Sequence, residues 1–143
     1  MCHNRAILIE SALALNGNLA ELTRLAAEID HFSQKHSLPD EVAFDLNLAL
    51  EELFTNALRH GGCEGMEDAV HIRVERQRDG VLVEFCDRGS AFDPLSAPPP
   101  NLEGALAARP VGGLGIHLVR QMMSDLRYER SGQWNRITMR KPI

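Results

Sequence analysis

A carboxylate and a carboxamide stand one helical turn apart in the stretch EELFTNALRHGG, residues 51–62, as Glu52 and Asn56. Residues four apart lie on the same face of an α-helix, so these two side chains are expected to act together. The amide oxygen of Asn56 suits Mg²⁺, and the Glu52 carboxylate could orient or deprotonate a nucleophile beside it. A helix with solvent-facing polar groups would show the same pair, which is therefore weak evidence alone.

A second candidate is Asp87, in the stretch CDRGSAFDP, residues 86–94. An acid at the end of a buried strand can present its carboxylate to a hydrogen-bond donor, and Gly89 leaves backbone room for a flat ligand ring. A turn that ends a strand needs the same residue types, so Asp87 does not by itself indicate a binding site.

A third candidate is the glycine-rich stretch VGGLGIHLV, residues 111–119. Gly112, Gly113 and Gly115 let the backbone approach a ligand closely, and a helix that begins there directs free N–H groups toward an anion. The stretch lacks the Gly-Lys-Ser/Thr of a Walker A loop, and it follows a proline-rich segment where a Rossmann motif would follow a strand. Glycines that only start a helix remain the alternative.

The elements that must position these residues follow from hydrophobic periodicity. Residues 6–10 predict a short strand, Leu19 to Phe32 an amphipathic helix, and Pro39 to the Gly61-Gly62 pair a second helix. Next comes a hairpin around Asp79-Gly80, with strands at residues 70–77 and 81–87. A glycine turn then leads into a helix, together residues 112–126. Two closing strands follow at residues 126–131 and 134–141.

Residues 88–111 show no period and hold five of the seven prolines, which is typical of a functional lid or a disordered segment. The order of elements predicts one domain, residues 1–143, of the α+β class. We expect a two-layer sandwich with helices on one face of a mixed, mostly antiparallel sheet and a long lid at about residues 88–111.

Composition excludes several classes of function. A net charge of −5 with both signs interleaved argues against a nucleic-acid-binding surface. No apolar run approaches the roughly 18 residues of a membrane helix, and no signal-peptide core is present, which predicts a cytoplasmic protein without membrane contact. Three cysteines without a C-x-x-C pair indicate neither a disulfide framework nor a zinc site.

The three candidate stretches occur in an order that resembles the GHKL ATPase fold: a metal-type helix, a strand ending in Asp-x-Gly, a long lid and a glycine-rich helix start. Within that superfamily the chain is most similar to the anti-sigma factor serine/threonine kinases of bacterial partner-switching systems. The likeness runs from about Ala6 to Lys141 and is carried by LEELFTNALRHG, CDRGSAFDPL, RPVGGLGIHLVRQMMSDLRYER and NRITMRK.

The resemblance implies a role for each matching residue. Glu52 would be the base or orienting group for the attacking hydroxyl, Asn56 would hold Mg²⁺ on ATP, and Asp87 would accept a hydrogen bond from the adenine amine. The broad superfamily has a second glycine where this chain has Ala91, a departure that bears on the lid and on the tightness of nucleotide binding. The remaining candidates would lie beside the nucleotide: Arg59, His60, Gly89, Arg109, Gly112, Gly113, Leu114 and Gly115.

The resemblance also implies a reaction and partners. The reaction is transfer of the ATP γ-phosphoryl group to a serine or threonine of an anti-sigma-factor antagonist. An RNA polymerase sigma factor is the implied client, and a homodimer the implied assembly. The alternative is a nucleotide-gated partner-binding module without significant kinase activity. A third, less favoured hypothesis is a detached histidine-kinase catalytic domain. Such a domain would need a helical hairpin with the phospho-acceptor, for which this chain has no room.

Overall fold

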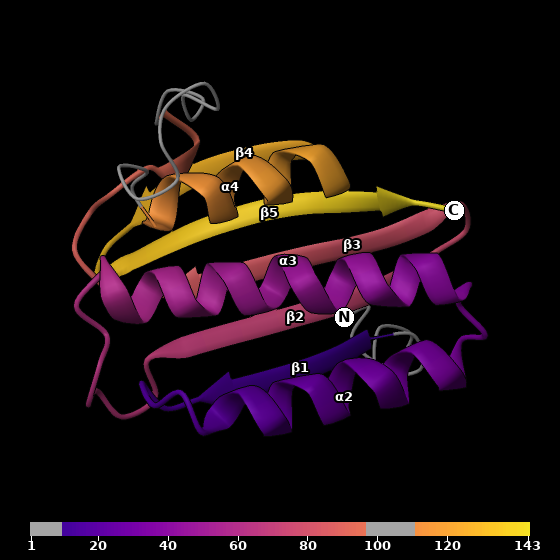
Figure 1. Cartoon of the computed structure of the whole chain (residues 1–143), viewed down its shortest axis with the longest axis horizontal. Helices are drawn as coiled ribbons and strands as arrows, with labels where there is room; N and C mark the ends of the chain where they lie inside the picture. The colour runs from indigo at the N-terminus through magenta and orange to yellow at the C-terminus, as the bar shows by residue number, and fades with distance from the viewer. Residues whose placement is uncertain (1–9, 97–110) are drawn as a thin grey trace.

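The structure is a computed structural model that describes residues 10–96 and 111–143 (Figure 1). The first described strand is β1, Glu10–Leu15, whereas the sequence placed the strand at residues 6–10. Residues 6–9 lie outside the described part of the chain. The prediction missed residues 11–15 because Ala12 and Ala14, which face solvent, give only a weak alternation with the more buried Leu13 and Leu15.

Five strands form one sheet in the order β1-β2-β3-β5-β4, and every neighbouring pair is antiparallel. The central hairpin confirms the prediction around Asp79-Gly80, and the closing strands also form a hairpin. The described sheet is therefore antiparallel throughout, whereas the sequence predicted a mixed, mostly antiparallel one. The strands after β1 are β2 Val70–Gln77, β3 Gly80–Asp87, β4 Ser124–Ser131 and β5 Trp134–Pro142.

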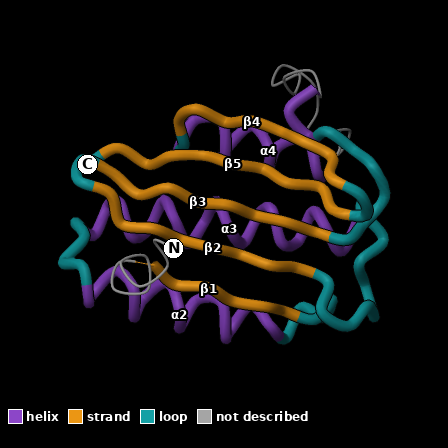
Figure 2. Tube along the Cα trace, turned by 180° about the vertical axis from the view of Figure 1, so that it is seen from behind, coloured by secondary structure: helices purple, strands orange, loops and turns teal. Residues whose placement is uncertain are grey.

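Three helices cover one face of this sheet: α2 Glu21–Lys35, α3 Asp40–Arg59 and α4 Val111–Met122 (Figure 1). Seen from behind, the strands lie in front of all three helices, so the opposite sheet face carries no helix from the described part of the chain (Figure 2). This confirms the two-layer arrangement. No helix in residues 10–96 and 111–143 is long and apolar enough to cross a membrane.

Helix α3 lies between α2 and α4 and packs against both of them. Pro39 and two acids open it, as the sequence predicted, because proline suits a helix start and carboxylates suit its positive dipole end. Its apolar stripe fills the core, and the buried members are Val42, Leu46, Ala49, Leu50, Leu53, Phe54, Ala57 and Leu58. Glu52 and Asn56 flank this stripe, so the packing of α3 fixes where they point.

Helix α4 differs from the prediction at both ends. It begins at Val111, so the glycines lie in its first turns instead of in a turn that precedes it. Local propensity disfavours helical glycine, but the apolar side of α4, with buried Ile116 and Val119, packs on the core and overrides that preference. The helix ends at Met122, before the expected residue 126. Strand β4 starts at Ser124, two residues earlier than expected, and its pairing with β5 is irregular between Ser124 and Arg127.

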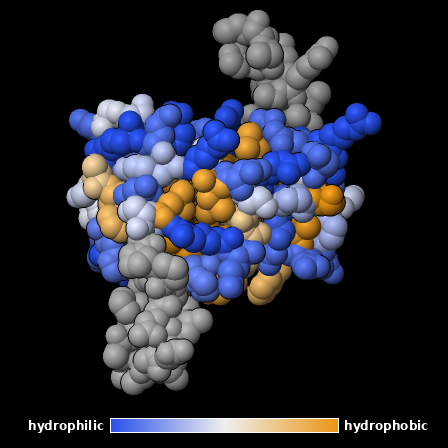
Figure 3. Space-filling view, turned by 90° about the horizontal axis from the view of Figure 1, so that it is seen from above, coloured by the Kyte–Doolittle hydropathy of each residue, from blue (hydrophilic) through white to orange (hydrophobic). Residues whose placement is uncertain are grey.

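The lid that the sequence predicts for residues 88–111 lies mostly outside the described residues. Its first part is described to Ser96 and includes a 3₁₀ turn, η1, at Pro94–Ser96. Seen from above, from the side of α4 and β4, hydrophobic residues form a patch surrounded by hydrophilic ones (Figure 3). The partly buried apolar side chains at this end of the molecule include Met122, Leu126 and Tyr128.

Candidate functional site

A pocket lies between α3, the carboxyl end of β3, the start of β5 and the segment that follows β3. About 350 Å³ of space that no protein atom fills, including open solvent at its mouth, lies within it. Its polar lining comes from Asn56, Asp87, Ser90 and Asn135, and its apolar lining from Leu53, Ala57, Phe85, Phe92, Pro94 and Ile137, with Gly61 at the end of α3. The fold therefore brings Asn56 and Asp87, which are far apart in the sequence, to the same pocket.

Asp87 is the last residue of β3, and one of its two carboxylate oxygens is held by the protein. The Gly89 backbone N–H and the Asn135 side-chain amide both donate to Oδ1, each at 2.9 Å. The Cys63 thiol lies 4.0 Å from the same oxygen. All the hydrogen bonds to this carboxylate that the described residues make fall on Oδ1, which leaves Oδ2 as the acceptor for a donor in the pocket.

Gly89 lies where the backbone after β3 approaches the end of α3. A Cβ at this position would lie 2.5 Å from the Gly61 carbonyl oxygen and 2.9 Å from Asp87 Oδ1, closer than atoms can pack. The next residue, Ser90, donates its backbone N–H to the same Gly61 carbonyl at 2.9 Å. A glycine is therefore required for the two segments to meet beside Asp87.

Glu52 contacts the first turns of α4 at Gly115. A Cβ on Gly115 would lie 2.3 Å from Glu52 Oε2, so the absence of a side chain there makes room for the carboxylate. Glu52 is half-buried and lies one turn before Asn56 on α3. The structure thus brings Glu52 together with one of the predicted phosphate-loop glycines, and Asn56 together with Asp87.

Other predicted residues are placed differently. Arg59 is exposed and lines a separate hollow with Gly17, Leu19 and Glu64 among others, away from the pocket that holds Asp87. His60 is exposed at the end of α3, where its backbone N–H donates to the Asn56 carbonyl at 2.8 Å. The backbone of residues 112–114, which are Gly112, Gly113 and Leu114, belongs to α4. Arg109 lies outside the described residues.

The sequence reasoning missed Asn135, which is only 4% exposed and lies in the wall of the pocket. A signal for it exists in the sequence. In the strand WNRITMRK the inward positions are Asn135, Ile137 and Met139, so a polar residue stands in an apolar series. Buried polar side chains need hydrogen-bond partners, and such a position therefore marks a polar contact inside the fold.

The environment around the free thiol next to Asp87 is poor in water. Cys63 is fully buried, and burial raises the pKa of its thiol from 9.0 to about 11, with the nearby Asp87 carboxylate adding to the rise. A thiol with this pKa stays neutral at physiological pH and packs as a small apolar group. The inner side of Asp87 therefore faces uncharged groups.

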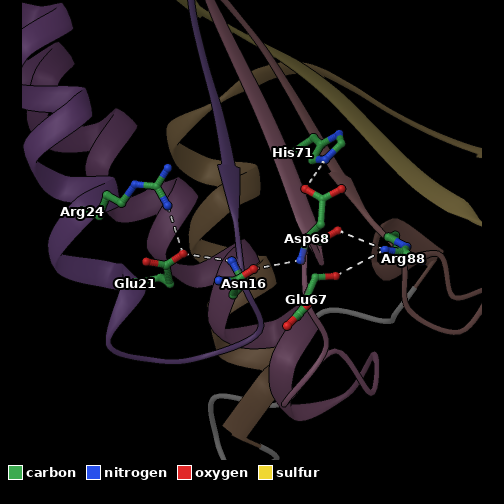
Figure 4. Close-up of polar contacts among 7 residues, drawn as sticks. All are labelled: Asn16, Glu21, Arg24, Glu67, Asp68, His71 and Arg88. Carbon is green, nitrogen blue, oxygen red and sulfur yellow. Dashed lines mark hydrogen bonds and ion pairs between the residues drawn. The ribbon is translucent and has the colours of Figure 1, made fainter.

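Hydrogen bonds link two loops to each other, and one of these loops to Arg88, the residue that follows the last residue of β3 (Figure 4). Asn16 Oδ1 accepts the backbone N–H of Asp68 at 2.9 Å, and the Asn16 backbone N–H donates to Glu21 Oε2 at 2.9 Å. Arg88, the neighbour of Asp87, donates to the carbonyl oxygens of Glu67 at 3.2 Å and Asp68 at 3.5 Å. These bonds join the loop after β1, the loop before β2 and the end of β3.

Asn56 fits the ligand type that Mg²⁺ takes in nucleotide sites. Its carboxamide oxygen is a hard, neutral donor at the edge of the pocket, and Mg²⁺ is usually bound through one or two protein oxygens together with phosphates and water. Over residues 10–96 and 111–143, no group of three or more His, Cys, Asp or Glu side chains is placed to hold a metal ion by itself.

Comparisons with known proteins give the chain's relatives. The family model described as the histidine kinase-like ATPase domain matches residues 15–141. The serine/threonine-protein kinase BtrW of Bordetella bronchiseptica is 30% identical over 111 residues, which cover 78% of each chain. The crystal structure of the RsbU and RsbW domains of Rv1364c from Mycobacterium tuberculosis matches with a TM-score of 0.69 at 13% identity. That match covers 93% of this chain but 32% of the other, and it shows a shared fold.

Proposed function

Since the chain belongs to the histidine kinase-like ATPase family, and within it to the anti-sigma factor serine/threonine kinases, we propose that it is an ATP-dependent protein kinase. Its substrate would be a serine or threonine of an anti-sigma-factor antagonist. The observation that carries this proposal is the placement of Glu52 and Asn56 one turn apart on α3, between the start of α4 and the pocket that holds Asp87.

ATP would lie across the pocket with its base at β3 and its phosphates toward α4. Asp87 Oδ2 would accept the hydrogen bond from the 6-amino group of adenine, beside the close backbone approach at Gly89. The first turn of α4, which begins at Val111, carries backbone N–H groups without helical partners and the positive end of the helix dipole. Both features favour the phosphates at that end.

The transfer step needs a base near the attacking hydroxyl. As the serine or threonine oxygen bonds to the γ-phosphorus, its proton would pass to the Glu52 carboxylate. The bond between the γ-phosphorus and the β–γ bridging oxygen breaks, and ADP leaves with that electron pair. Mg²⁺ held through Asn56 would supply charge neutralisation at the phosphates. The protein's own contribution is to position the groups, since little covalent chemistry is asked of it.

The partners follow from the same proposal. The phosphate acceptor would be the antagonist, the client an RNA polymerase sigma factor, and the assembly a homodimer in the cytoplasm. Sedimentation of the purified chain, alone and with each candidate partner, would test the assembly and each association separately from the chemistry.

A transfer assay tests the reaction. Wild-type protein with γ-labelled ATP and Mg²⁺ should label a cognate antagonist, while Glu52→Gln should lose transfer and keep ATP binding. Glu51→Gln is the matched control, because Glu51 is the preceding residue and is exposed. A Glu52→Gln protein that transfers at the wild-type rate would show that Glu52 is not the base. Partner affinity that changes with nucleotide while no phosphoprotein forms would favour a nucleotide-gated binding module.

A further inference from the structure

One buried carboxamide makes hydrogen bonds on both of its ends beside the pocket. Asn135 Nδ2 donates to Asp87 Oδ1 at 2.9 Å and to the Ser90 carbonyl oxygen at 2.8 Å, with the Gly89 carbonyl oxygen at 3.4 Å. All three partners are acceptors. One NH₂ group therefore holds the carboxylate at the end of β3 and the two carbonyls of the chain that follows it.

The other end of the Asn135 amide faces donors. Its Oδ1 accepts the Tyr128 hydroxyl at 2.6 Å and faces the Phe92 backbone N–H at 3.4 Å. A flipped amide would place its oxygen against the carboxylate of Asp87 and its NH₂ against a backbone N–H. Since neither contact is a hydrogen bond, the surroundings allow one orientation of the amide, and the Tyr128 hydroxyl must be the donor in its contact.

We propose that Asn135 is a positioning residue for adenine recognition, and that Tyr128 holds its amide in the working orientation. By occupying Asp87 Oδ1, the amide fixes the rotation of the carboxylate and leaves Oδ2 as the oxygen to which the 6-amino group of a purine in the pocket can donate. The inference rests on the proposed binding of ATP. It adds that Asn135 positions the Asp87 carboxylate that selects for the amine.

The same amide also fixes the chain that leaves β3. Its bonds to Ser90 and Gly89, and its contact with the Phe92 N–H, set the path of residues 88–93 along the pocket. Arg130 Nη1 adds a second bond to the Gly89 carbonyl oxygen at 2.8 Å. One side chain, Asn135, therefore contributes both to recognition of the base and to the path of this segment. Arg130 shares only the contact with the Gly89 carbonyl oxygen.

The test compares two nucleotides that differ only at the 6-amino group: ATP and purine riboside triphosphate. Their dissociation constants are measured by calorimetry for wild type, Asn135→Leu and Tyr128→Phe. Wild type should prefer ATP by about tenfold or more, because a hydrogen bond to a charged acceptor is worth that much. Asn135→Leu, which keeps the branched shape and the number of side-chain heavy atoms, should lose most of this preference by weakening ATP binding alone.

Tyr128→Phe keeps the ring and removes only the hydroxyl, so it serves if Asn135→Leu does not fold. It should lower the preference for ATP in the same direction by a smaller factor. Thr138→Ala is the control, because Thr138 lies on the same strand but on the opposite face of the sheet and should leave both constants unchanged. Far-UV circular dichroism confirms that each variant is folded before binding is compared.

The outcomes separate this inference from the proposed function. Wild type that binds neither nucleotide contradicts the proposed function itself. Wild type that prefers ATP, with variants that keep the full preference, overturns the role of Asn135. Variants that weaken both nucleotides equally also overturn it, because that result shows a structural effect without selection for the amine.

Discussion

Replacement of Gly115 by alanine should slow phosphoryl transfer about a hundredfold without lowering stability. A Cβ on Gly115 would lie 2.3 Å from Glu52 Oε2 and 3.3 Å from Glu52 Cδ. Since non-bonded carbon and oxygen atoms pack at well over 3 Å, the carboxylate must move by about 1 Å or more. A displacement of about 1 Å of a catalytic group can cost roughly a hundredfold in rate, and we expect a loss of that order.

The expected stability follows from two opposing terms. Alanine in a helix is about 1 kcal/mol better than glycine, and Gly115 lies inside α4. Against this, the clash is with the end of a flexible side chain, which can rotate at a cost of about 0.5–1.5 kcal/mol. The two terms nearly cancel, so the free energy of unfolding of Gly115→Ala should stay close to the wild-type value.

Single-turnover transfer of γ-labelled phosphate measures the transfer rate, and urea denaturation of the same samples measures the free energy of unfolding. A double mutant isolates the contact, because in Glu52→Ala the nearest remaining atom of residue 52 is Cβ, 3.8 Å from the added methyl group. In that background Gly115→Ala should stabilise by about 1 kcal/mol, and the difference between backgrounds is the coupling between the positions. Transfer by Gly115→Ala at the wild-type rate would refute the assigned roles of Gly115 and Glu52.

Three further predictions concern a partly buried ion pair and the Cys63 thiol. Lys141 Nζ lies 2.6 Å from Asp45 Oδ2, and both side chains are only 16% exposed. Lys141→Met should therefore lower the free energy of unfolding, measured by urea denaturation, by about 1.5–3 kcal/mol. Glu129→Gln, which removes one partner of an exposed ion pair, is the control and should change it by less than about 0.5 kcal/mol. The Cys63 pKa of about 11 makes its thiolate about a hundredfold scarcer than at 9.0, so native Cys63 should be alkylated far more slowly at pH 8 than unfolded Cys63. The folded thiol keeps its proton to higher pH than the unfolded one, so its contribution to stability is complete below pH 9.0 and is lost as the pH rises to about 11. The urea midpoint of the wild-type protein should therefore fall between these two pH values. In Cys63→Ala it should fall less.

The sequence predicts best where a local pattern decides the structure. The apolar positions of α3 repeat with the helical period, and Pro39 marks its start, so both the helix and the shared face of Glu52 and Asn56 follow from the chain alone. Likewise the Asp79-Gly80 signal between two alternating strands predicts a hairpin, and the structure confirms it, with the turn at residues 78 and 79 and Gly80 paired with Gln77. In these segments the local preference and the tertiary packing agree.

Prediction fails where packing overrides local preference. The strand at residues 10–15 lies at the edge of the sheet and alternates leucine with exposed alanine, a weaker pattern than the apolar run before it. The glycines at 112, 113 and 115 disfavour a helix locally, yet α4 includes them. Gly115 can be accommodated because it faces Glu52, a contact between distant segments that no periodicity shows.

Asn135 shows why part of the site depends on sheet register. It pairs directly with Asp87 across β3 and β5, and their side chains share the core-facing side of the sheet. A shift of the pairing by one residue would turn Asn135 to the opposite face and leave Asp87 Oδ1 without this donor. The register is in turn fixed by the apolar pairs farther along the same strands, such as Phe85 with Ile137. The orientation of the carboxylate in the pocket is therefore set by core packing as well as by its own hydrogen bonds.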